Sequence, residues 1–489
     1  MTALNSGLAA DATVVGPARP QTLRAAWLPL LALALAFFVE MVDNTILTIA
    51  LPTIGRELGA STTALQWITG AYTLTFGGLL LTAGSLADGL GRRRVLLWAL
   101  TAFGLLSGLV LFVTTAGQLI AVRAALGIAA AGMAPVTMSL VYRLFDDERL
   151  RMRAITLMIV VGMSGFALGP ILAGSMLSQL AWHWLLAVNL PVAAIAVLGV
   201  RIGIPADAPG DLHDAPLDAP GAVLTMLMMG STAYVLTSGV EHGWTAPLTL
   251  LAALVAVAST AGFVRRERTA EHPMLDLTLL ANRTIRGAAL AQLGGSVAMI
   301  GAIFALTLHF QDAYGWSPMR AGLANLPFVV TMLLATPVAE QLAARLGHRI
   351  ATLVAAATLT VSLAGMAWAV PHGYAAIAAA MVGMTIGLRT IMTICAIALV
   401  DAMPVNRTSV GAALNDTAQE VGTSVGIAVV GTVLAAALGT AGVGAWDSAT
   451  IAAFLHGERL AFVLLAVIVG LVAAYGANAL TDSRSIEEN

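Results

Sequence analysis

The chain has 489 residues, of which 59% are hydrophobic and only 10% are charged, and its net charge is −2. Because a soluble globular protein carries about 25% charged residues, this composition excludes a soluble domain and indicates a polytopic membrane protein. The small net charge predicts no strongly acidic or basic partner and no nucleic acid. The one cysteine, Cys395, lies in an apolar run, which excludes an internal disulfide.

Apolar runs of about 20 residues, the length that crosses a bilayer as a helix, recur along the chain. The polar, Ala- and Pro-rich residues 1–24 are predicted to be disordered, and they contain no short apolar core with a cleavage site. Fourteen spans are predicted, over residues 26–50, 64–86, 95–114, 117–142, 154–178, 182–203, 220–239, 247–264, 286–310, 320–344, 350–370, 374–400, 409–437 and 459–480.

The arginines indicate how these spans are oriented. With the N-terminus in the cytoplasm, nineteen arginines fall in cytoplasmic segments, and only Arg56, Arg320 and Arg459 fall outside. The remaining two, Arg123 and Arg389, lie within spans. Because basic residues concentrate on the cytoplasmic side, fourteen spans with both termini in the cytoplasm are predicted.

An internal repeat divides the chain into two halves. Residues 342–349 match residues 86–93 at Leu, Ala, Leu, Gly and Arg, and repeats of this kind are typical of secondary transporters. The offset of 256 residues exceeds six spans with short loops, so two spans near 220–264 are predicted to be inserted. The predicted parts are a disordered tail (1–24), an N-terminal six-helix bundle (25–203), a linker with two extra spans (204–284), a C-terminal six-helix bundle (285–481) and a tail (482–489).

The first copy of the repeat contains an acid, Asp88, shortly before Arg92 and Arg93. Arginines at a membrane surface could serve only as a topological anchor. A carboxylate at a helix end beside them can also form an ion pair that holds one conformation closed. The second copy has Ala344 opposite Asp88, so this contact is predicted in the first half alone.

Charged side chains inside spans cost about 2.5–3.5 kcal/mol each at mid-bilayer, so each needs a partner, water or a function. Glu40 and Asp43 lie three residues apart on one helical face. Asp43 is predicted to carry protons, and the alternative is a structural residue near the outer headgroups. Arg123 cannot release a proton, so it is predicted to control a neighbouring carboxylate, and the alternative is an arginine that reaches to the interface.

The second half contains further charges within its spans. Asp416 and Glu420 lie one turn apart on one helical face, with Gln419 beside them. One alternative is that Arg389 pairs with one of these acids as a structural lock. An acid without such a partner, facing a cavity, would suit protons or organic cations.

Several segments resemble known motifs. Residues 84–96 resemble the G-x-L-a-D-x-x-G-r-r loop of the major facilitator superfamily, with Gly89 where a basic residue is usual. Residues 43–52 resemble the helix 1 signature of drug:proton antiporters, with Thr48 in place of Asn. Residues 165–174 resemble the g-x-x-x-G-P-x-x-G-G motif that separates exporters from importers, in which small residues and Gly-Pro allow close helix packing and a kink.

Three further segments, residues 123–131, 182–191 and 315–327, also match motifs of this superfamily. The resemblance covers nearly the whole chain from Ala25 and is specific to fourteen-helix drug:proton antiporters of the QacA/EmrB type. It implies an all-α major facilitator fold. The residues singled out for gating are Asp88, Arg92, Arg93, Gly165, Gly169 and Pro170. Those singled out for proton coupling are Asp43, Glu40, Arg123, Asp416 and Glu420, and those for substrate binding are Asp43, Asp416, Gln419, Glu420 and Arg389.

These features predict a secondary transporter rather than an enzyme. The chain has no G-x-x-x-x-G-K-[ST] motif, so ATP is not expected to supply the energy. The leading hypothesis is a monomeric proton-coupled exporter of amphipathic, often cationic small molecules in a bacterial cytoplasmic membrane, without cofactor or metal. The alternative is a dedicated exporter of one metabolite, possibly an anion bound by Arg389. A sensor or a channel is less favoured, since the loops are short and a channel does not need the exporter motif.

Overall fold

The computed structural model describes residues 20–145, 147–207, 218–270, 277–403, 408–439 and 446–480. Helices make up almost all of these residues, and none of them lies in a strand. The α-helices are α1 (Trp27–Leu58), α2 (Thr62–Leu90), α3 (Arg92–Leu109), α4 (Ala116–Ala131), α5 (Ala134–Leu144), α6 (Glu148–Leu177), α7 (His183–Ala187), α8 (Asn189–Gly203), α9 (Ala219–Glu241), α10 (Pro247–Thr269), α11 (Arg283–Leu308), α12 (Pro318–Ala324), α13 (Leu326–Leu334), α14 (Thr336–Ala369), α15 (Tyr374–Asp401), α16 (Thr408–Leu438) and α17 (Ser448–Ala479). Three 3₁₀ turns, η1 (Val110–Phe112), η3 (Leu279–Ala281) and η5 (Val370–His372), and a π-helical segment, η4 (His309–Ala313), complete the helical structure.

Eleven helices in the described residues are long and apolar enough to cross a membrane, and two shorter apolar helices lie at Leu168–Leu177 and Pro318–Leu334. The all-helical prediction is therefore confirmed, whereas the number fourteen and the location of the termini stay predictions. The end of the predicted span 320–344 and nearly all of the span 350–370 lie in α14, on either side of a kink at Gly347. Gly347 breaks its geometry with φ 75° and ψ 165°, a conformation that glycine adopts without strain.

Helix ends follow local capping chemistry. Ser61 accepts a hydrogen bond from the backbone of Ala64 and begins α2. Thr115 and Gln118 form a reciprocal capping box at the start of α4. The Asp447 carboxylate caps α17 through Thr450, and these hydrogen bonds lower the pKa of Asp447.

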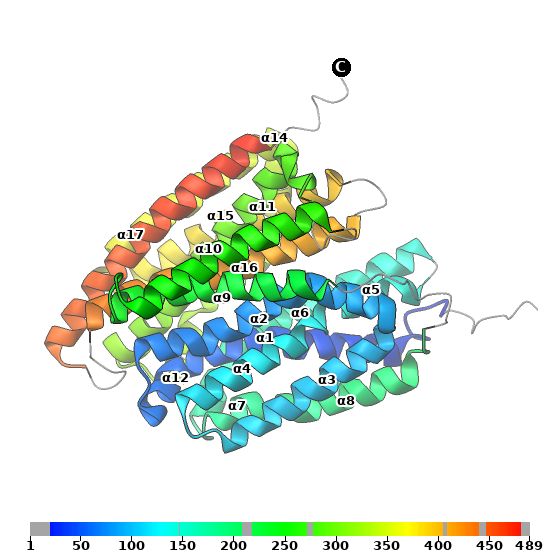
Figure 1. The fold of residues 1–489 in the computed structure, drawn as a ribbon, viewed down its shortest axis with the longest axis horizontal. Coiled ribbons are helices and arrows are strands. Elements are labelled where there is room, and N and C mark those ends of the chain that lie inside the picture. The colour runs from blue at the N-terminus through cyan, green and yellow to red at the C-terminus, as the bar shows by residue number, and fades with distance from the viewer. Residues whose placement is uncertain are drawn as a thin grey trace, which may run out of the picture.

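The helices form two groups that correspond to the two halves of the sequence (Figure 1). Helices α1 to α8 lie in the lower part of the view, and most of the C-terminal half, including α14 to α17, lies in the upper part. The halves contact each other through α2 against α16 and α6 against α12. Helix α9 packs on both α2 and α16, and α10 packs on α9, so this pair lies across the boundary between the halves.

Candidate substrate and proton site

Asp43 is completely buried near the middle of α1. Its Oδ2 accepts a hydrogen bond from Arg123 Nη1 of α4 at 2.6 Å, and its Oδ1 accepts one from Asn189 Nδ2 of α8 at 2.9 Å. Side chains from three helices of the N-terminal half therefore meet at one carboxylate. This position does not fit the alternative of a residue among the outer lipid headgroups.

Arg123 is only 2% exposed, so it does not reach to the membrane surface. Besides its contact with Asp43, its Nε donates to the Ile68 carbonyl at 3.4 Å. Its guanidinium also lies over the Tyr72 ring, 4.3 Å from the centroid, where the ring face attracts a cation. Inside the protein, the arginine is thus paired with one acid and lies against one aromatic ring.

Glu40 lies one turn before Asp43 and is 1% exposed. Its Oε2 has no hydrogen-bond partner among the described residues. The charges of Glu420, Asp416 and Asp43 all act on this carboxyl group. We call Glu40, Asp43, Asp416 and Glu420 the acidic cluster, since it brings acids of α1 and α16 within electrostatic reach.

The two acids of α16 face the N-terminal half. A Cβ added at Gly77 of α2 would lie 2.6 Å from Glu420 Cβ, so the two helices approach closely there. Asp416 is exposed and accepts a hydrogen bond from Asn415 at 3.2 Å, while Glu420 and Gln419 are half-buried. Like charges this close favour uptake of a proton or of another cation.

Arg389 lies elsewhere. Its Nε donates to Thr336 Oγ1 of α14 at 3.0 Å, and the nearby charge that acts on it is that of Glu340. The described contacts join it to neither Asp416 nor Glu420. The alternative of a structural lock between Arg389 and the α16 acids is therefore wrong, because α14 supplies its partners.

The glycines of the exporter-type motif bring α6 close to α1. A Cβ at Gly165 would lie 3.0 Å from the Phe38 carbonyl oxygen, and one at Gly169 would collide with Thr45. On the C-terminal side of this stretch, the Pro170 carbonyl oxygen lies 2.5 Å from the position of a Cβ at Gly322. Small residues thus allow α6 to pack on α1 in its own half and on α12 of the other half.

Gly169→Val is expected to destabilise the protein by about 1–3 kcal/mol and to reduce folded yield, since the added carbons overpack the contact with Thr45. Gly365→Val in α14 is the matched control, because nothing lies within 4 Å of a Cβ there. Melting temperatures of the two purified variants check this. Equal melting temperatures would contradict the packing role of Gly169.

The arginine-rich loop contacts an acid that the sequence analysis did not single out, Asp207, which follows α8. The Asp207 carboxylate accepts hydrogen bonds from the Arg93 backbone and from Arg143 Nη1, each at 3.1 Å. The Arg93 guanidinium donates to the Arg201 carbonyl at 2.7 Å. The side chain of Asp88 lies outside the described part of the structure, so its ion pair stays a prediction. The loop after α8 contains several aspartates, so the sequence offered no signal that set Asp207 apart from the others.

At the opposite end of the bundle, polar contacts join the two halves. Arg56 of α1 pairs with Asp312 of η4 at 3.1 Å, and Gln311 donates to the Ile49 carbonyl at 2.7 Å. Asp312 and Gln311, the partners from the C-terminal half, are buried and therefore shielded from solvent. They close this end of the boundary between the halves.

Further along the same boundary, α2 and α16 are joined by two hydrogen bonds. Gln66 donates to the Ala428 carbonyl at 3.2 Å, and the hydroxyls of Ser424 and Thr73 lie 3.2 Å apart. All four residues belong to spans that sequence analysis treated as apolar. Their pairing depends on which helix faces which, and hydropathy does not contain that information.

A second buried polar pair lies within the C-terminal half. His309 Nδ1 and Glu458 Oε2 are 2.7 Å apart, and both side chains are completely buried. Sequence analysis missed both, and it included Asn189 only within the motif at 182–191, without a role. The available signal was a titratable or amide side chain within an apolar segment, the same signal that identified Asp43.

Comparisons with known proteins agree with this arrangement. The model of the Major Facilitator Superfamily matches residues 33–427. The multidrug efflux pump LfrA of Mycolicibacterium smegmatis is 32% identical over 86% of this chain and 83% of its own. The puromycin resistance protein of Streptomyces alboniger is 32% identical over 94% of this chain and 92% of its own. The methylenomycin A resistance protein of Streptomyces coelicolor is 31% identical over 93% of each.

Solved structures show the same fold at low sequence identity. The POT family transporter PepTSo matches with a TM-score of 0.67 at 14% identity, over 96% of this chain and 99% of its own. A bacterial homologue of the human lysosomal transporter Spinster, in an inward-facing and unoccupied conformation, matches with a TM-score of 0.63 at 16% identity, over 95% and 98%. With the family model and the efflux relatives, these likenesses lead to one conclusion: the chain belongs to the Major Facilitator Superfamily and is a multi-pass membrane transporter.

Proposed function

We propose that this transporter exports amphipathic, often cationic small molecules in exchange for protons. The observation that supports this most is the acidic cluster at the boundary between the halves, where Glu40 Oε2 has no partner among the described residues. A proton and a bound cation both relieve the repulsion within this cluster. The proton and the substrate cation would therefore compete for the same negatively charged groups, and such competition is the basis of antiport. The efflux and resistance relatives support drug-like compounds as substrates.

Arg123 supplies a way to couple conformation to protonation. Its guanidinium keeps its own proton and donates a hydrogen bond to the Asp43 carboxylate at 2.6 Å. Movement that parts Asp43 from Arg123 would break this pair, and we place the proton exchange of the transport cycle at that step. Binding and release of protons would thereby follow the alternation between the two faces of the membrane.

We further propose that the chain crosses a bacterial cytoplasmic membrane fourteen times with both termini in the cytoplasm. The arginine-rich loops would then lie on the cytoplasmic side, and the contacts of Arg56 and Gln311 on the outer side. A closed outer end is one requirement of a state that receives substrate from the cytoplasm.

Transport by the purified chain in liposomes with an imposed pH gradient tests the proposal. Uptake of several cationic and neutral dyes, abolished by a protonophore, is the expected result. Uptake of one compound alone would favour the dedicated exporter, and uptake that persists without the gradient would contradict proton coupling. Absence of all transport by folded protein would contradict the export function.

A further inference from the structure

The two inserted helices leave one face without a protein partner. Helix α10 packs chiefly on α9, and its outer residues are largely exposed: Leu250 55%, Leu254 65% and Val257 68%. The same stretch is among the segments apolar enough to span a membrane. This face therefore meets lipid rather than another helix of the described chain.

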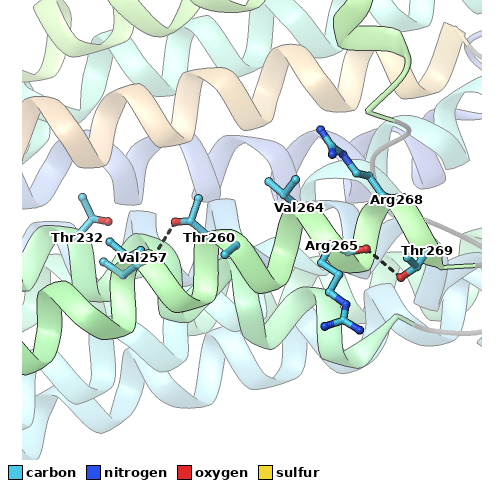
Figure 2. Close-up of a pocket in the computed structure, with 9 residues that line it drawn as sticks. Thr232, Val257, Thr260, Val264, Arg265, Arg268 and Thr269 are labelled. Atoms are coloured by element: carbon cyan, nitrogen blue, oxygen red, sulfur yellow. Dashed lines mark hydrogen bonds between the residues drawn. The ribbon is translucent and has the colours of Figure 1, made fainter.

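A groove of about 770 Å³ runs along this face (Figure 2). Thr232 of α9 and Val257 lie at one end of it, Val264 lies further along, and Arg265 and Arg268 lie toward the other end. Eight residues of helix separate Val257 from Arg265, a rise of about 12 Å. The groove is thus an apolar channel with two cations at one end.

The walls of the groove offer few free polar groups. The hydroxyl of Thr260 donates to the Ala256 carbonyl at 2.7 Å, and that of Thr232 donates to the Met228 carbonyl at 2.7 Å. Because the backbone already uses these hydroxyls, the walls present mainly hydrocarbon to a ligand. This surface suits an alkyl chain.

The arginines differ in how they are paired. Arg266 of the same turn pairs with Asp218 at 3.1 Å, and Asp218 also caps α9, so this contact ties the two inserted helices together. Arg265 and Arg268 are exposed, and the described residues provide no acid for either of them. Two exposed guanidinium groups beside an apolar groove, with no acid paired to them among the described residues, suit an anion that is attached to a hydrocarbon chain.

We propose that this groove binds an anionic phospholipid, with its headgroup at the end lined by Arg265 and Arg268 and one acyl chain along Val264 and Val257. Basic pockets beside membrane helices bind acidic headgroups in this way. A zwitterionic lipid would fit the apolar part equally well but would bring its own cation close to the arginines. The site is independent of the proposed transport chemistry, since none of its residues belongs to the acidic cluster.

The position of the groove gives the lipid a structural consequence. Helix α9 packs on α2 of one half and α16 of the other. A Cβ at Gly78 of α2 would lie 3.0 Å from Met226 of α9, so this contact is close. A lipid that holds α10 against α9 would therefore stabilise the boundary on which the halves move.

Binding of phosphatidylglycerol and phosphatidylcholine to the full-length purified protein, measured by native mass spectrometry, tests the site. Wild-type protein is expected to retain phosphatidylglycerol preferentially, and Arg265→Gln/Arg268→Gln is expected to lose about tenfold or more of that affinity. Arg265→Lys/Arg268→Lys should keep most of it, because the charge is retained. Ala261→Trp, which fills the groove, should weaken retention of both lipids.

The matched control is Arg149→Gln/Arg153→Gln, which removes two exposed arginines at the start of α6. This variant should bind phosphatidylglycerol as wild type does. If both double variants lost the same affinity for phosphatidylglycerol, general surface charge would explain the binding, and the proposed site would be overturned. Equal binding of the two lipids by wild type would overturn it as well.

Discussion

Asp43→Asn is expected to abolish proton-driven transport and to lower the melting temperature of the protein. Asp43 is the only acid that contacts Arg123 in the described structure, and both side chains are buried. Removing one partner of a truly buried pair leaves the other charge without compensation and costs about 3–5 kcal/mol. The amide can still accept a hydrogen bond from Asn189, so the loss arises from charge rather than from shape.

The variant Asp43→Asn/Arg123→Gln separates stability from transport. Removing both charges should restore much of the melting temperature, because no charge is then buried alone. Transport should stay at the level of empty liposomes, since both the titratable group of Asp43 and the Arg123 guanidinium that pairs with it are absent. The measurements are the melting temperature and dye uptake driven by a pH gradient. An Asp43→Asn protein with wild-type uptake and an unchanged pH profile would place the proton carrier elsewhere.

The second large effect is expected from Asp416→Asn/Glu420→Gln in α16. Both carboxyl groups act on Glu40, and Arg389 does not neutralise them. Removing both should lower export of a cationic dye at least about tenfold, since two Coulomb interactions with the substrate are lost. Export of a neutral dye should change little, and folded yield should stay normal because no buried cation is stranded.

Glu340→Gln is the matched control for this pair, because it removes an exposed acid of the same half whose charge acts on Arg389. It should leave export of both dyes close to wild type. The single variants Asp416→Asn and Glu420→Gln show which acid contributes more. If the well-folded double variant lost export of both dyes equally, the two acids would not act by attracting the charge of the substrate. That result would indicate proton coupling instead.

The sequence by itself determined the helical class, and it predicted the spans and the two halves with their inserted pair. These features depend on local hydrophobicity and on the repeat of residues 86–93 at 342–349. It also identified Asp43 and Arg123, because a charge within an apolar run is costly wherever its partner lies. The close packing of α6 was foreseeable as well, since Gly165 and Gly169 are spaced for one helical face.

Only the tertiary structure decided which of these charges meet. Asn189 is 146 residues from Asp43, and Asp312 is 256 residues from Arg56, so no local pattern connects either pair. Arg389 shows the limit most directly, since its partners lie on α14 rather than beside the α16 acids. The rotation of each helix about its axis is set by how side chains pack against neighbouring helices, and that packing is decided only when the whole bundle assembles.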